Sequence, residues 1–310
     1  MIWITKNFGK YLFVGRGSTS DDEVLFRKYA KLGGQNFQDY FRQKDISLGK
    51  PLLTSIHRTP QRTLDIADQL SAFIDNVYYS DNNAGFCCVW VGGMSFQLPA
   101  VVAAYLPHTP MIAVPLSANV IGGGLDAFIS NSNLPPGIPV GVVAPHSDKK
   151  NSLPDAFLIS EKIVNNYFDY VVLIPKDYSC DYFDKAKSLL DSLEVPYKIK
   201  EPEEDKAELC INIFDNFIDA TKFDFFDGVC LSCANPTSKY ADITLDGILN
   251  SISKCNNSLY FTRPENAAIF AAQILSASRK GLRKNLVEYK RDAKIKYGDN
   301  PKINDAFFSR

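Results

Sequence analysis

The sequence predicts an α/β protein in which helices cover both faces of a mostly parallel sheet. In the first half, short apolar runs typical of strands alternate with segments of helical periodicity. After a polar joint at residues 146–152 the alternation begins again, and the 310 residues are about twice a common domain of roughly 150. We therefore predict two units of this kind, covering residues 1–166 and 167–310.

The elements of the first half follow from hydrophobic spacing and from flanking glycines and prolines. Apolar runs predict buried strands at residues 10–14, 52–53, 86–91, 111–114 and 138–144. Helical spacing predicts helices at residues 22–32, 60–76 and 98–105. Strands and helices alternate along the chain, and this is the order that a parallel sheet requires.

Apolar spacing in the second half predicts a similar order of strands and helices. The strands are expected at residues 170–174, 197–199 and 229–233, and the helices at residues 182–193 and 209–220. Two further helices open on Pro154 and Pro264, because a proline in the first turn has no hydrogen bond to lose. Each proline is followed by an acidic residue and then by apolar residues at similar spacing. This repeated pattern, whose two occurrences are about 110 positions apart, favours two related units.

Composition favours a globular protein with a small-molecule ligand. The chain is 45% hydrophobic, and its 34 basic residues nearly balance 35 acidic ones for a net charge of -1. This composition excludes disordered and fibrous classes. It also lacks the electrostatic footprint of non-specific nucleic-acid binding, so we expect no nucleic-acid partner.

No stretch approaches the roughly 18 apolar residues that span a bilayer, and no long apolar core follows the first six residues as in a signal peptide. We therefore expect a cytoplasmic protein without a membrane partner. Seven cysteines, an odd number, favour reduced thiols over a disulfide framework. Cys230 and Cys233, like Cys87 and Cys88, lie in strand-like surroundings that favour buried core thiols over a metal or redox pair.

A glycine turn rich in hydroxyls follows the first strand, at residues 15–21. Such a turn, leading from strand to helix, aims backbone N–H groups and the helix dipole at one spot, which suits a phosphate. The carboxylate of Asp21 could accept hydrogen bonds from ribose hydroxyls. A plain Ser or Asp helix cap explains the same residues.

A second polar cluster, residues 55–60, lies between the strand at residues 52–53 and the following helix. Ligands gather at strand ends in parallel sheets, and this turn offers an anion clamp, Arg58, beside a proton carrier, His57. A surface turn with an incidental histidine is the alternative. Three glycine-bearing segments follow at residues 92–99, 122–126 and 134–140, and tight turns account for each of them equally well.

Together, in this order, the five segments resemble the family of N5-carboxyaminoimidazole ribonucleotide mutases and aminoimidazole ribonucleotide carboxylases of purine biosynthesis. The family pattern is Gly-Ser-x-Ser-Asp, Ser-Ala-His-Arg, a glycine run ending in His-Leu-Pro-Gly, Gly-Leu-Asp and Met-Pro-x-Gly-x-Pro-Val. The matching segments here are residues 17–21, 55–58, 98–99, 124–126 and 135–140. The resemblance covers about residues 10–166.

The resemblance implies a flavodoxin-like three-layer αβα sandwich. It also implies that His57 is the acid/base that moves a proton while carbon dioxide leaves one atom of the aminoimidazole and joins C4. No metal or organic cofactor is needed, and the partners are the aminoimidazole ribonucleotide and carbon dioxide. The implied substrate-binding residues are Gly17, Ser18, Ser20, Asp21, Ser55, Arg58, Gly93, Gln97 and Leu98.

The sequence departs from the family pattern at two positions. Gln97 replaces the second histidine, and Ala100 replaces the glycine after Leu-Pro. The Gln97 amide can donate and accept hydrogen bonds but cannot take up and release a proton. The carboxylase branch, which uses free carbon dioxide, also lacks that histidine but usually has Lys at the position of Arg58. The pair His57-Arg58 therefore favours the mutase, while the carboxylase and a non-catalytic ribonucleotide-binding scaffold stay open as alternatives.

The second half resembles the same family weakly, and its first loop, residues 175–179, has lost the phosphate-loop pattern. All three histidines, His57, His108 and His146, lie before residue 147, so this half cannot repeat the proton transfer. We interpret it as a degenerate copy kept for assembly. Because the family forms octamers, the resemblance implies a homo-oligomer, a tetramer of two-copy chains. We expect His108 and His146 to have structural roles or to face solvent. We expect the basic run at residues 279–296 to form an exposed helix.

Overall fold

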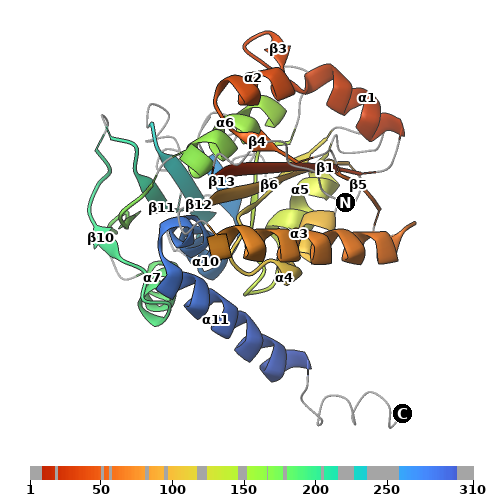
Figure 1. Cartoon of the computed structure of the whole chain (residues 1–310). Coiled ribbons are helices and arrows are strands. Elements are labelled where there is room, and N and C mark those ends of the chain that lie inside the picture. The colour runs from red at the N-terminus through yellow and green to blue at the C-terminus, as the bar shows by residue number, and fades with distance from the viewer. Residues whose placement is uncertain are drawn as a thin grey trace.

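The computed structural model describes residues 9–17, 20–49, 52–55, 58–80, 84–93, 97–116, 124–145, 152–165, 167–176, 180–203, 206–215, 227–235 and 258–298. Within these residues, eleven strands form a single large sheet, and a separate two-stranded hairpin lies outside it. Helices pack on both faces of the sheet (Figure 1). The α/β class predicted from the sequence is confirmed.

The strands of the first half are β1 (Lys10–Arg16), β2 (Lys31–Leu32), β3 (Gln35–Asn36), β4 (Ser47–Leu48), β5 (Leu52–Leu53), β6 (Gly85–Gly92), β7 (Met111–Pro115) and β8 (Val140–Val142). Its helices are α1 (Ser20–Tyr29), α2 (Phe37–Gln43), α3 (Pro60–Ser80), α4 (Leu98–Tyr105), α5 (Leu125–Ser132) and α6 (Ser152–Asn165).

The strands of the second half are β9 (Val171–Leu173), β10 (Tyr197–Ile199), β11 (Leu209–Phe214), β12 (Val229–Ala234) and β13 (Ser258–Phe261). Its helices are α7 (Asp181–Ser192), α10 (Pro264–Leu275), the 3-10 turn η1 (Ser276–Ser278) and α11 (Lys280–Gly298). The predicted boundary at residue 166 falls between α6 and β9.

The strand order is β8-β7-β6-β1-β4 in the first half, with β5 also paired to β1, and every one of these pairs is parallel. This is the order of the flavodoxin-like fold, in which the first strand lies between the second and the third. The second half has the order β13-β12-β11-β9-β10, again parallel throughout. The two halves join where β13 pairs with β8 in antiparallel register, at Tyr260 and Val142.

Alternation along the strands supplies both faces of the sheet with apolar side chains. In β1, Leu12 and Val14 enter one core, whereas Tyr11 and Phe13 enter the other. Strand β6 is buried along its whole length, as expected for a central parallel strand covered on both faces. Helices α1, α2 and α6 cover the first face and α3, α4 and α5 the second, which gives three layers (Figure 1).

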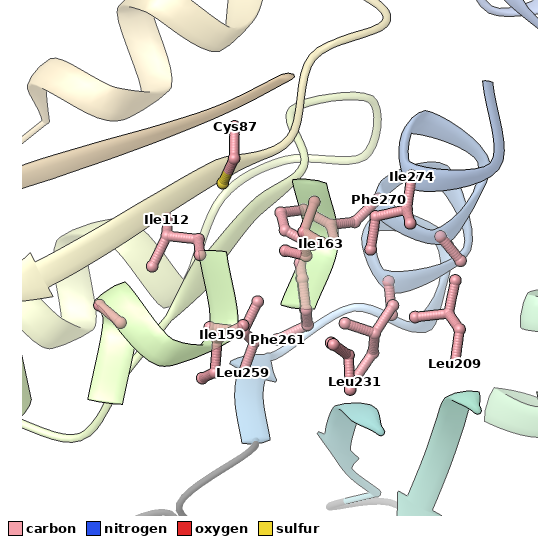
Figure 2. Close-up of a cluster of buried hydrophobic side chains, with 14 of the residues drawn as sticks. Cys87, Ile112, Ile159, Ile163, Leu209, Leu231, Leu259, Phe261, Phe270 and Ile274 are labelled. Carbon is pink, nitrogen blue, oxygen red and sulfur yellow. The ribbon is translucent and has the colours of Figure 1, made fainter. Parts of the chain in front are cut away.

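A single hydrophobic core crosses the junction between the halves. Ile112 from the first half, Ile163 from α6 and Leu231 from the second half belong to the same cluster (Figure 2). Because apolar burial is the main stabilising term in folding, the continuous cluster makes the stability of each half depend on the other.

Helix α10 closes the second half. It packs mainly on α7 and also touches β11 and β12, and all but one of its twelve residues are buried. The carboxamide of Asn266 joins it to the first half, since its oxygen accepts from the N–H of Gly137 at 2.9 Å and its nitrogen donates to the carbonyl of Pro135 at 3.1 Å.

The prediction of a helix at residues 209–220 is wrong where the structure describes that segment. Residues 209–214 form strand β11, which pairs with β9 and β12 and is buried throughout. A short, continuous apolar run has no periodicity that separates a buried strand from a buried helix. The isoleucines Ile211 and Ile213 should have favoured the strand, because β-branched side chains fit a pleated sheet.

Several elements were not predicted from the sequence. Residues 31–36 form the β2–β3 hairpin, whose turn holds Gly33 and Gly34 at φ +55° and +82°, and residues 37–43 form helix α2. Asn36 caps α2 by accepting from the N–H of Gln38 at 2.9 Å. Helix α5 and strand β13 were also missed, since neither is long enough to show a clear period.

Other predictions agree with the structure. The thiols of Cys87, Cys88, Cys230 and Cys233 are buried in strands, and the imidazole of His108 is buried as well. The basic run forms α11, whose Leu282 and Leu286 are buried while its charged side is largely exposed. In the part of the chain that the structure describes, every helix is too short or too polar to cross a membrane.

Candidate functional site

Four strand ends of the first half meet at the carboxyl edge of the sheet. Strand β1 lies between β5 and β6, and backbone bonds extend the pairing past the strand ends. The N–H of Gly17 donates to the carbonyl of Val91 at 2.9 Å, and the N–H of Leu116 donates to that of Gly92 at 2.9 Å. The loops that follow β1, β5, β6 and β7 therefore start side by side, at the place where open parallel sheets bind ligands.

The end of β1 is shaped by a close contact between Gly15 and Trp90. These two residues are register partners on β1 and β6, and a Cβ atom at Gly15 would lie 2.0 Å from the indole ring. Only glycine therefore fits at this position while the fully buried Trp90 keeps its place. The contact fixes the two strands directly beneath the first glycine loop.

The turn after β5 is closed by its own hydroxyl groups. The Ser55 Oγ accepts from the N–H of Arg58 at 3.2 Å, and the N–H of Thr59 donates to the Ser55 carbonyl at 2.9 Å. Below the turn, the buried Thr54 exchanges a hydrogen bond with Thr63 of α3 at 2.8 Å between their Oγ1 atoms. Ser55 is half-buried and Arg58 is exposed, so the turn presents its cation to solvent.

The helices that follow β1, β5 and β6 begin at this edge, because each follows a parallel strand that ends there. Helix α1 opens at Ser20, α3 at Pro60 and α4 at Leu98. The first turn of a helix has unpaired N–H groups and a partial positive charge, and both attract anions. The convergence of three N-termini makes the edge receptive to a phosphate or carboxylate.

Arg16 adds a cation that sequence reasoning did not assign to the site. Its side chain is mostly buried at the end of β1 and forms an ion pair with Glu23 of α1 at 3.2 Å. Glu23 also pairs with Arg27, and the two guanidinium groups hold the pKa of the Glu23 carboxyl below its usual range, Arg16 contributing most. A basic residue at the very end of the first strand was the signal in the sequence that could have identified it.

The segment after β6 contributes Gly93, Gln97 and Leu98. Gln97 precedes α4 and is exposed, and its side chain makes no capping hydrogen bond. Gly93 is half-buried beyond the end of β6. The Leu98 side chain is only 2% exposed within the second core, so any ligand contact of this residue would come from its backbone.

Of the last two motif segments, one lies at the opposite edge of the sheet and the other begins α5, the helix that follows β7. Gly137 has φ +91° and precedes β8, so residues 135–139 lie at the amino edge of the sheet, where they contact α10 rather than the site. Gly124, at φ +90°, allows the chain to turn into α5. Both glycines therefore have conformational reasons for their presence.

The structure thus brings together Gly17, Ser55, Arg58, Gly93 and Gln97 at one edge of the sheet. Ser18 and His57 lie outside the described residues, as does His146. Ser20 and Asp21 open α1, and only their backbone is described.

The fold and this edge define a flavodoxin-like α/β protein with an anion-receptive site at the carboxyl ends of its strands. Residues 16–156 match the family model described as AIR carboxylase. The chain is also 35% identical, over 91 residues, to the N5-carboxyaminoimidazole ribonucleotide mutase of Methanocaldococcus jannaschii, an alignment that covers 29% of this chain and 48% of that protein. Residues 16–156 are therefore similar to the AIR carboxylase family, and the chain spans about half the length of the curated relative that it matches.

Proposed function

We propose that the first half interconverts N5-carboxyaminoimidazole ribonucleotide and 4-carboxy-5-aminoimidazole ribonucleotide in purine biosynthesis. The observation that carries the proposal is the Ser55–Arg58 turn, whose family motif stands at an edge where three helix N-termini converge. The family match and the similarity to a mutase support the same activity.

In this proposal the edge binds the ribose phosphate of the substrate. Arg58 donates to phosphate oxygens, and the N-termini of α1 and α3 contribute N–H groups and their dipoles. The hydroxyls of Ser18, Ser20 and Ser55 and the carboxylate of Asp21 complete the contacts, and Gly17 and Gly93 allow close backbone approach. Gln97 and the backbone of Leu98 face the base.

The chemical step moves one carboxyl group and one proton. The bond from N5 to the carboxyl carbon breaks and carbon dioxide is released within the site. The same carbon then bonds to C4, the C4 proton leaves, and the nitrogen regains a proton. His57 shuttles this proton, because an imidazole that titrates near neutrality serves as acid and base. Exclusion of water keeps the carbon dioxide from escaping.

A direct assay tests the proposal. The chain is incubated with either carboxylated isomer, and conversion is followed by the change in ultraviolet absorbance. We expect conversion by the natural chain, loss of conversion in His57→Asn with binding retained, and little change in the matched control His146→Asn. Tight ribonucleotide binding without any conversion by the natural chain would refute the enzyme and support a non-catalytic binding scaffold.

A specific observation favours that scaffold as the second candidate. Gln97 stands where the family has a second histidine, and its exposed amide cannot take up and release a proton as an imidazole does. The carboxylase branch is distinguished by its substrate: a strong preference for aminoimidazole ribonucleotide with bicarbonate, over the N5-carboxylated isomer, would overturn the mutase assignment.

The proposal extends to assembly and to the second half. We expect a tetramer of this chain in which the second half, a degenerate copy of the first, occupies positions that separate subunits hold in the family octamer. The repeated strand order supports this arrangement. Light scattering tests it, and a monomer in solution would refute it.

A further inference from the structure

A small cavity lies where helices α10 and α11 of the second half meet the first half. Its polar wall includes Gln273 of α10, Lys290 of α11 and the turn at Gly137 of the first half. Most of the remaining wall is apolar and includes Ala103 and Ile269. Residues of both halves therefore form the cavity.

Gln273 brings a hydrogen-bond acceptor to this cavity. The residue is 1% exposed, and its amide nitrogen donates to the carbonyl of Pro107 at 3.1 Å. This bond fixes the orientation of the carboxamide. The Oε1 atom is buried and accepts no hydrogen bond from the part of the chain that the structure describes. Buried amide oxygens in folded proteins are usually paired with a donor from the protein or from an ordered water, so Gln273 points to a donor within the cavity.

Lys290 brings hydrogen-bond donors to the same cavity. Its ammonium donates to the carbonyl of Gly137 at 2.9 Å, the one acceptor that it has among the described residues. An ammonium group has three N–H bonds, so two remain for other partners. Burial also lowers the pKa of Lys290, as expected for a cation that has lost much of its contact with solvent.

The size and the chemistry of the cavity fit one water molecule. The space open to the centre of a water-sized sphere is about 10 Å³. A buried water needs roughly 10–15 Å³ of such space and two to four polar partners. A water accepts from an ammonium and donates to a carbonyl oxygen, so it suits both polar groups. A chloride ion would be repelled by the Gln273 oxygen, and a metal cation by the Lys290 ammonium.

We propose that this cavity is a binding site for a single water molecule, which accepts a hydrogen bond from Lys290 and donates one to Gln273. Through Lys290 the hydrogen bonds continue to the Gly137 carbonyl. The water thereby joins α10, α11 and the turn of the first half in one polar network. The motif segment at residues 135–140, which lies away from the candidate site, thus acquires a role in holding the two halves together.

Magnetic relaxation dispersion of solvent water tests the proposal on the full chain, because it counts water molecules that stay bound for long times. Gln273→Met and Lys290→Met should each bind one long-lived water fewer than the natural chain. The double variant should also lose only one, because both side chains hold the same molecule. Gln61→Met, which changes an exposed glutamine of α3, is the matched control and should keep the natural count.

An unchanged count in either single variant, or a loss of two waters in the double variant, would overturn the proposal. Thermal unfolding of each variant shows whether it remains folded. A high-resolution crystal structure of the natural chain gives an answer that needs no variant: we expect one water within hydrogen-bond distance of the Lys290 Nζ and the Gln273 Oε1. A crystal soaked in bromide that shows an anomalous peak in this cavity would identify an anion site and refute the water.

The measurements are independent of the proposed mutase activity. His57→Asn, which should abolish conversion of the carboxylated isomers, should keep the natural number of long-lived waters. Failure of one proposal therefore leaves the other intact.

Discussion

The guanidinium carbon of Arg283 lies 3.6 Å from the centroid of the Tyr78 ring. Arg283 belongs to α11 in the second half, and Tyr78 belongs to the last turn of α3 in the first. The same guanidinium donates to the carbonyls of Ser276 and Ala277, each at 2.7 Å, so it ties α11 to η1 as well. A single side chain therefore joins three elements across the two halves.

Arg283→Met should destabilise the protein by about 2–3 kcal/mol, because it removes the contact with the Tyr78 ring and two charge-assisted hydrogen bonds. Urea unfolding followed by circular dichroism measures the change. Arg291→Met is the matched control on the same helix: its guanidinium is exposed and, among the described residues, pairs only with Asp292 at 3.5 Å, so we expect less than about 0.5 kcal/mol. Equal effects of the two substitutions would contradict this account of Arg283.

The stability of the protein should fall on mild acidification because of His108. Burial lowers the pKa of His108 below its ordinary value of 6.5, and Arg283 lowers it further, while Asp75, with its Oδ1 3.5 Å from Nε2, opposes the shift. The unfolded chain therefore binds a proton at a higher pH than the folded chain does. The contribution to stability is complete above pH 6.5 and is lost as the pH falls from there through the lowered pKa of the folded state.

The variant His108→Gln isolates this effect. Thermal unfolding measured at several pH values should show a weaker loss of stability for His108→Gln than for the natural chain on acidification. His146→Gln serves as the control and should keep the natural pH dependence. Parallel pH profiles for the natural chain and His108→Gln would show that another group is responsible.

Gly15→Ala should be strongly destabilising, although it adds a single methyl group. The new Cβ would lie 2.0 Å from the buried Trp90 ring, and neither strand can move without breaking the register of β1 and β6. We expect a loss of about 2 kcal/mol or more, as for other overpacked cores. Gly281→Ala, on α11 with no atom within 4 Å of its added methyl, should instead stabilise the protein by about 0.5–1 kcal/mol. A double variant that also replaces Trp90 by Leu should recover part of the loss at Gly15.

Arg58→Met should weaken the binding of a ribonucleotide more than tenfold, because a bidentate, charge-assisted contact to phosphate contributes about 1.5–3 kcal/mol. Isothermal titration at low and high salt measures the affinity and its salt dependence, and both should decrease in the variant. Arg42→Met, which changes an exposed arginine of α2 paired with Asp39, is the matched control and should bind as the natural chain does. Unchanged affinity in Arg58→Met would place the phosphate elsewhere.

The sequence was sufficient for the α/β class and for most of the long elements, because strands such as β6 and helices such as α3 carry long, clear patterns. Strand β11 was mistaken for a helix because its burial on both faces leaves no periodicity to interpret. The antiparallel pairing of β13 with β8 depends on contacts about 120 residues apart, which no local pattern encodes.

At the candidate site, motif order predicted which loops would meet, and β5, β1 and β6 do bring Ser55, Gly17 and Gly93 to one edge. Arg16 was missed because its importance comes from its place at a strand end and from its ion pair with Glu23. A buried polar cluster in the second half was missed for a related reason: its members, Lys176, Cys180, Asp215 and Asn235, are separated by up to 59 positions and converge only when the strands align.

The antiparallel pairing of β8 with β13 also determines in which direction the carboxyl edge of each half faces. Since all strands within each half run in parallel, the two carboxyl edges face opposite ends of the molecule. The carboxyl edge of the first half, where we propose the ribonucleotide site, therefore lies at the other end of the sheet from the carboxyl edge of the second half. The apolar side chains that the two halves share lie between these two ends.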